Sequence, residues 1–130
     1  MWGPLCHPRH VEFYKDFHLR QRPEDDWMPM SRAVQHLRSL PDASKLYAFT
    51  SLWRFHVTTS PTFHEHNKHA SVEIVWRWNE RMFYLAFGSL ANGWLDDRSA
   101  EVTCDEAGFP SAGDPFLHRL LASVYPGQTG

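Results

Sequence analysis

The sequence predicts an α+β fold: an antiparallel sheet of three to four strands, flanked by N- and C-terminal helices that pack mainly on one face. Two observations lead to this prediction. Residues 71–88 place apolar pairs on a single face when they fold back at a short turn, as a β-hairpin does. Stretches near both ends of the chain repeat apolar residues every three or four positions, as amphipathic helices do. At 130 residues, the chain is long enough to bury a core.

The hairpin turns at Asn79-Glu80, and pairing outward from this turn sets its register. One face then carries three apolar pairs, which are Trp76 with Phe83, Ile74 with Leu85, and Val72 with Phe87. The opposite face mixes charged and apolar side chains, namely Glu73, Val75, Arg77, Met82 and Tyr84. We expect the helices on the apolar face, which leaves the mixed face as a solvated wall or a binding surface.

The helical stretches define the domain organisation. A short helix over residues 8–17 lies in an N-terminal arm, residues 1–26, whose aromatic residues predict that it packs on the rest of the protein. Residues 27–130 are then a single α+β domain, with a helix over residues 29–40. The last helix is predicted to begin with Asp114 as its N-cap and Pro115 in its first position.

Two more strands are expected outside the hairpin. Residues 46–57 alternate well enough to predict one long strand, and residues 100–104 predict a short one. Side by side with the hairpin, the long strand would place Phe49, Trp53 and Phe55 on its apolar face. An uncovered edge strand would also allow a homodimer.

Composition narrows the class of protein. The net charge of −2 argues against nucleic acid, although Arg54 and Arg77 each lie between aromatic residues as in single-strand binders. The sequence shows neither a secretory signal nor a run long enough to span a membrane, so we expect a cytoplasmic protein. Cys6 and Cys104 are then two free thiols rather than a disulfide.

Histidine is abundant, with nine copies, and three of them lie in the stretch of residues 63–69. His64 and His66 are two positions apart, so in an extended segment their rings point the same way and could share a divalent ion such as zinc. His69 is close enough to join them, with His56 or Glu65 as a fourth ligand. The competing interpretation is a polar loop of solvated histidines, because imidazoles without supporting hydrogen bonds bind metal weakly.

The H-x-H-x-x-H spacing of His64, His66 and His69 resembles part of the metal-binding motif of metallo-β-lactamase-fold hydrolases. The resemblance covers six residues. Lys68 stands where that family has an aspartate ligand, and the chain is far shorter than the family's αββα sandwich. We therefore do not extend the family's function to this protein.

No complete catalytic set is visible in the sequence, which favours a non-enzymatic binding or protein-interaction module. Its partner would be a protein or a small-molecule ligand. The expected binding residues lie on the mixed sheet face, namely Arg54, His56, Glu73, Arg77 and Tyr84. The alternative is a protein that binds zinc or another divalent metal through His64, His66, His69 and His56, with hydrolysis as the reaction such a site would support.

Overall fold

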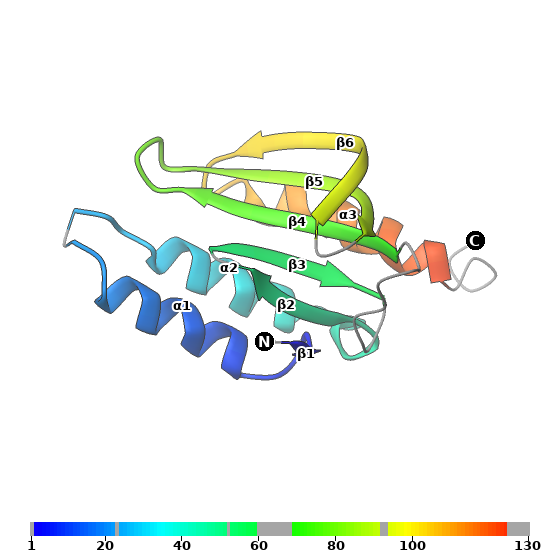
Figure 1. The fold of residues 1–130 in the computed structure, drawn as a ribbon, viewed down its shortest axis with the longest axis horizontal. Coiled ribbons are helices and arrows are strands. Elements are labelled where there is room, and N and C mark those ends of the chain that lie inside the picture. Colours follow the sequence, from blue (N-terminus) through cyan, green and yellow to red (C-terminus); the bar gives the residue numbers. More distant parts are fainter. Residues whose placement is uncertain (1, 23, 52, 60–68, 92–93, 125–130) are drawn as a thin grey trace.

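The structure, a computed structural model, describes residues 2–22, 24–51, 53–59, 69–91 and 94–124. It has one sheet with helices packed against it (Figure 1). The strands are β1 (Trp2–Pro4), β2 (Tyr47–Ser51), β3 (Arg54–Thr58), β4 (His69–Arg77), β5 (Met82–Ala91) and β6 (Trp94–Cys104). The helices are α1 (Arg9–Leu19), α2 (Met28–Arg38), the 3₁₀ turn η1 (Ala43–Lys45) and α3 (Phe109–Val124).

The α+β class is confirmed, but the expected number of strands is wrong. The six strands pair antiparallel with their neighbours in the order β1-β2-β3-β4-β5-β6. The prediction of three to four strands missed β1, whose three residues are too few to show a period. It also counted β2 and β3 as one strand.

The β4–β5 hairpin has the predicted register throughout. Trp76 pairs with Phe83, Ile74 with Leu85 and Val72 with Phe87, while Glu73, Val75 and Arg77 pair with Ala86, Tyr84 and Met82. The apolar pairs are buried, because this face is the one that the helices cover. A single buried face fixes the register, since a slip of one residue would send every apolar side chain to the other side.

Residues 46–57 do not form one strand, because the chain reverses between β2 and β3. Ser51 pairs with Arg54, so the alternation restarts after the turn. Phe55 lies in the core as expected, but Phe49 stacks on His56 on the face away from the helices, and the side chain of Trp53 is exposed. The apolar alternation did not reveal the turn, because it continues in sequence through both strands.

One core joins the helices to the sheet. It contains Val11 and Tyr14 of α1, Val34 and Leu37 of α2, and Leu117 and Leu120 of α3, together with the buried face of the hairpin. Leu5 of the N-terminal segment is also fully buried there. Among the described residues, no helix is long and apolar enough to cross a membrane.

Helix α3 begins at Phe109, five residues before the predicted N-cap at Asp114. The ring of Phe109 is buried against Phe83, with ring centroids 4.8 Å apart, and this contact draws the preceding turn into the helix. The side chain of Asp105 accepts the backbone N–H of Gly108 at 2.8 Å just before the helix. Pro115 therefore lies inside the helix rather than in its first position.

A bulge bends β6 where it passes Gly88. Phe87 pairs with Ala100 and Ser89 pairs with Asp96, so three residues of β6 lie opposite one residue of β5. A β-carbon at Gly88 would lie 2.5 Å from the backbone oxygen of Asp96. Only glycine allows so close an approach, and Arg98 lies in the middle of the bulge.

A candidate binding groove

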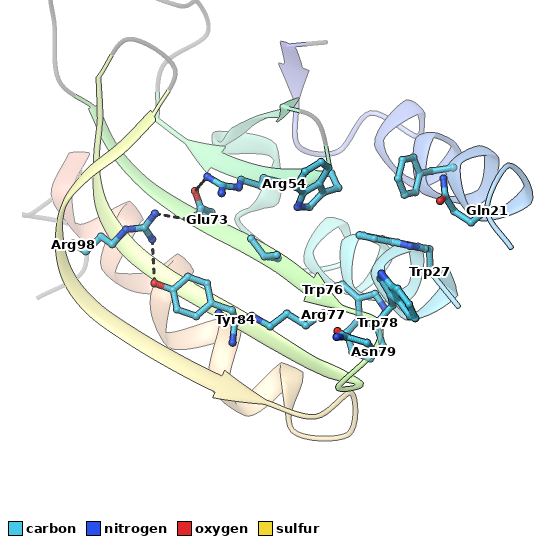
Figure 2. A pocket seen from close by; sticks show the side chains of 13 residues that line it. Gln21, Trp27, Arg54, Glu73, Trp76, Arg77, Trp78, Asn79, Tyr84 and Arg98 are labelled. Atoms are coloured by element: carbon cyan, nitrogen blue, oxygen red, sulfur yellow. Dashed lines mark hydrogen bonds and ion pairs between the residues drawn. The ribbon is translucent and has the colours of Figure 1, made fainter. Parts of the chain in front are cut away.

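A groove of about 760 Å³ lies at one end of the sheet (Figure 2). Its lining comes from the ends of α1 and α2, the β2–β3 turn, strands β3 to β6 and the β4–β5 turn. This cavity is called the groove below. The residues that line it are Phe17, Gln21, Trp27, Trp53, Arg54, Glu73, Val75, Trp76, Arg77, Trp78, Asn79, Tyr84 and Arg98.

The groove exists because β3 is shorter than β4. Strand β3 pairs with β4 from Thr58 to Phe55 only, so the residues of β4 after Ile74 have no strand beside them on that side among the described residues. Two hydrogen bonds fix the surrounding walls. Tyr14 of α1 donates its hydroxyl to the carbonyl of Trp53 at 3.2 Å, and the indole N–H of Trp76 donates to the carbonyl of Asp26 at 2.8 Å.

Glu73 is the acidic centre of the groove, and its side chain is only 2% exposed. Arg98 donates from Nη2 to Oε1 of Glu73 at 3.3 Å, and Nη1 of Arg54 lies 3.8 Å from Oε2. Oε2 has no hydrogen-bond partner among the described residues. One buried carboxylate thus lies between two guanidinium groups, which compensate the cost of burying its charge.

His56 lies opposite Glu73 on the neighbouring strand β3 and does not line the groove. Its ring stacks on Phe49 with centroids 4.6 Å apart, and its Nε2 is 3.7 Å from Oε2 of Glu73. Burial, together with the smaller effect of the positive charges of Arg54 and Arg98, lowers the pKa of His56 to about 4. The imidazole is therefore neutral near pH 7 and adds no charge to the site.

Tyr84 lies between two arginines. The guanidinium carbon of Arg77 is 5.0 Å from the centre of its ring and that of Arg98 is 5.8 Å away. Its hydroxyl donates to Oε1 of Glu101 at 2.5 Å and accepts from Nη1 of Arg98 at 3.2 Å. Burial and the hydrogen bond to Glu101 raise the pKa of Tyr84, so the phenol keeps its proton. These contacts hold both guanidinium groups in place.

The two ends of the groove differ in character (Figure 2). Arg98, Glu73 and Tyr84 lie at the charged end, whereas Trp27, Trp76 and Trp78 gather at the other, with Arg77 between the two groups. Trp76 and Trp27 are buried, but Trp78 and Trp53 are 39% and 43% exposed. Such large apolar side chains in contact with water mark a surface suited to binding.

The lining is rich in arginine and aromatic side chains, and it has no serine, threonine, cysteine, lysine or histidine among the described residues. It holds three arginines against one carboxylate, an excess of two positive charges in a chain whose net charge is −2. Six of its side chains are aromatic.

Four of the five expected binding residues line the groove, namely Arg54, Glu73, Arg77 and Tyr84. The fifth, His56, is outside the lining and contacts Glu73 from the neighbouring strand β3. Sequence reasoning missed Arg98, because β6 was expected to begin only at residue 100. It also missed Trp53 and Trp78 as groove residues, and no sequence signal places Phe17 or Trp27 beside them.

The predicted metal ligands His64 and His66 lie outside the described residues. His69 begins β4, and the orientation of its side chain lies outside the description as well. His56 is enclosed by Phe49 and Glu73. Within the described ranges, no three histidine, cysteine, aspartate or glutamate side chains gather as a metal site. The metal hypothesis thus stays a prediction, which elemental analysis of untagged protein would test.

Comparisons of the chain with protein-family models, with curated proteins and with solved structures found no match.

Proposed function

We propose that this protein is a non-enzymatic protein-interaction module, which binds a segment of a partner protein in the groove. The composition of the groove carries the proposal. Tryptophan, tyrosine and arginine are the residue types enriched at energetic centres of protein interfaces, whereas lysine, glutamate, aspartate, serine and alanine are depleted there. Nine of the thirteen lining residues are aromatic or arginine, and none belongs to the depleted types except Glu73.

The exposure of two tryptophans favours a partner segment over an enclosed small molecule. A pocket for a small ligand covers most of that ligand's surface. Here Trp53 and Trp78, at 43% and 39% exposure, keep a large part of their rings in solvent. A segment lying along the groove would cover both rings and remove their apolar surface from water.

The missing strand beside the end of β4 favours an extended segment. An extended chain can add to an uncovered strand edge through backbone hydrogen bonds, while neighbouring pockets select its side chains. The uncovered part of β4, Val75 to Arg77, belongs to the lining of the groove. Its walls are already fixed by the bonds of Tyr14 and Trp76, so binding would cost little ordering of the protein.

Selection from a random peptide library displayed on phage tests the proposal. We expect clones that bind the wild-type protein and lose most of their binding to Trp78→Ala, because this exposed ring contributes to the groove and little to the core. Leu19→Ala is the matched control, since Leu19 is 79% exposed and lies outside the groove lining. Clones that bind all three proteins equally, or the absence of any clones, would overturn the proposal.

A further inference from the structure

We infer that the segment bound in the groove is acidic: it presents a carboxylate to Arg77 and Arg98 and an apolar side chain to Trp78. This inference rests on the proposed function and names the chemistry of its partner. The observation behind it is that the lining holds three arginines and the single, buried carboxylate of Glu73, whereas Glu80 and Glu101, which contact Arg77 and Tyr84, lie outside the lining. An anionic segment is attracted to such a patch and a cationic one is repelled.

Arg98 has N–H donors left over for a further carboxylate, and its orientation is fixed. A guanidinium has five N–H donors, and the two hydrogen bonds of Arg98 to Glu73 and Tyr84 occupy two of them. These bonds hold the planar group in one orientation, and its remaining donors can take a second carboxylate in the two-pronged geometry that arginine favours.

Arg77 is held less tightly than Arg98. Its only ion pair among the described contacts is with Glu80, three residues away, at 3.7 Å between Nη1 and Oε2. Both side chains of this pair are about half exposed, and surface pairs of this kind contribute little. A carboxylate of the partner can therefore replace Glu80 at Arg77, while the ring of Tyr84 stays in contact with the guanidinium.

Glu73 does not make the groove a site for a basic segment. Its side chain is 2% exposed, and Arg54 and Arg98 lie on its two oxygens. A lysine or arginine of a partner would have to approach these guanidinium groups before it reached the carboxylate. Like charges at such short range oppose binding, so Glu73 acts by positioning arginines rather than by attracting cations.

The distance between the two ends of the groove sets the spacing between the carboxylate and the apolar side chain of the bound segment. Glu73, Val75 and Arg77 lie on the same face of β4, and four residues of a strand span about 13 Å. Trp78 follows Arg77 directly in sequence. It lies with Trp27 and Trp76 at the end of the groove opposite Arg98 (Figure 2). An extended segment that reaches both ends therefore carries its carboxylate and its apolar side chain within about four positions of each other.

Sequencing the clones that depend on Trp78 tests the inference. We expect aspartate or glutamate to be enriched within about four positions of an aromatic or branched apolar residue. A synthetic fluorescein-labelled peptide of the enriched sequence should bind with a Kd that rises with salt concentration, because the attraction is between charges. Its affinity should fall about tenfold or more in Arg98→Gln and in Arg77→Gln.

Arg22→Gln is the charge-matched control, because Arg22 is exposed and lies outside the lining. Arg77 is itself exposed, so a loss in Arg77→Gln cannot come from a damaged core. Clones that depend on Trp78 but are neutral or basic would overturn the inference and leave the proposed function standing. The absence of clones that depend on Trp78 would overturn both.

Discussion

Arg98 of β6 and Glu73 of β4 are joined by a hydrogen bond of 3.3 Å that passes over the whole width of β5. The two strands are not neighbours in the sheet, so no backbone ladder joins them. The bond is made because the bulge at Gly88 bends β6 across the sheet at Arg98. One charged contact therefore links the curvature of the sheet to the electrostatics of the groove.

Replacing Arg98 with methionine should lower the free energy of unfolding by about 1–2 kcal/mol. A hydrogen bond to a charged group contributes about 1.5–3 kcal/mol, and the 32% exposure of the Arg98 side chain reduces this value. Urea unfolding measures the difference. Arg22→Met, a change of the same type at an exposed site, should stay within about 0.5 kcal/mol. In a Glu73→Gln background the effect of Arg98→Met should shrink, and an unchanged effect would contradict the pairing.

Stability should fall when the pH drops from about 6.5 to about 4. The pKa of His56 is lowered by burial to about 4 in the folded protein, so between these values the unfolded chain binds the proton and the folded chain does not. Protonation then favours unfolding, by at most about 3 kcal/mol at the acid end. Above pH 6.5 His56 contributes no pH dependence.

Urea unfolding of His56→Gln across pH 4 to 8 checks this expectation. The variant should lose much of the slope, whereas His118→Gln, at an exposed position, should keep it. Burial also lowers the pKa of His10, whose ring bonds the carbonyl of Pro4 at 3.1 Å, so some slope of the same sign should remain. An identical slope in the wild type and His56→Gln would contradict the placement of this ring.

Two tryptophans near each other in sequence should respond differently to replacement by phenylalanine. Trp76→Phe removes a buried ring and the bond from its indole N–H to the carbonyl of Asp26, at a cost of about 2–3 kcal/mol. Trp78→Phe changes a ring that is 39% exposed and should cost less than about 0.5 kcal/mol. Thermal unfolding measures both, and similar losses would mean that Trp78 is part of the core.

Gly88→Ala should destabilise the protein by about 1–3 kcal/mol. The new methyl group would meet the backbone oxygen of Asp96 at 2.5 Å, and backbone cannot move aside as a flexible side chain can. Gly3→Ala is the control, because nothing lies within 4 Å of a β-carbon there. The shift in melting temperature measures both variants. An unchanged melting temperature in Gly88→Ala would show that β6 can give up the bulge without loss of stability.

The sequence predicted the structure best where contacts between residues close in sequence determine it. The register of the β4–β5 hairpin follows from a short turn and three apolar pairs, all within eighteen residues, and every predicted pair is present, although the turn spans residues 78–81 rather than Asn79-Glu80 alone. The division between β2 and β3 was missed because the alternation runs on through the turn. Phe49 and Trp53 were consequently placed on the wrong face. Local periodicity records which residues alternate, but not where the chain reverses.

Most of the groove could not be predicted, because it is built by contacts between residues that are distant in sequence. Arg77 and Tyr84 could be predicted, since they lie opposite the apolar face of the same hairpin. Arg98 reaches Glu73 only because of a bulge, and bulges have no reliable sequence signal beyond an isolated glycine. Phe17 and Trp27 join the groove through the packing of helices whose ends are distant in sequence from the sheet.

The groove also depends on the completion of folding. Every described strand pairs with its neighbours in sequence, and the pairings other than β1–β2 close short loops that form quickly. The groove, in contrast, needs Phe17 from the first helix and Arg98 from the last strand. It cannot form until both are in place, so a partner that binds it selects the finished protein and shifts the folding equilibrium toward that state by mass action.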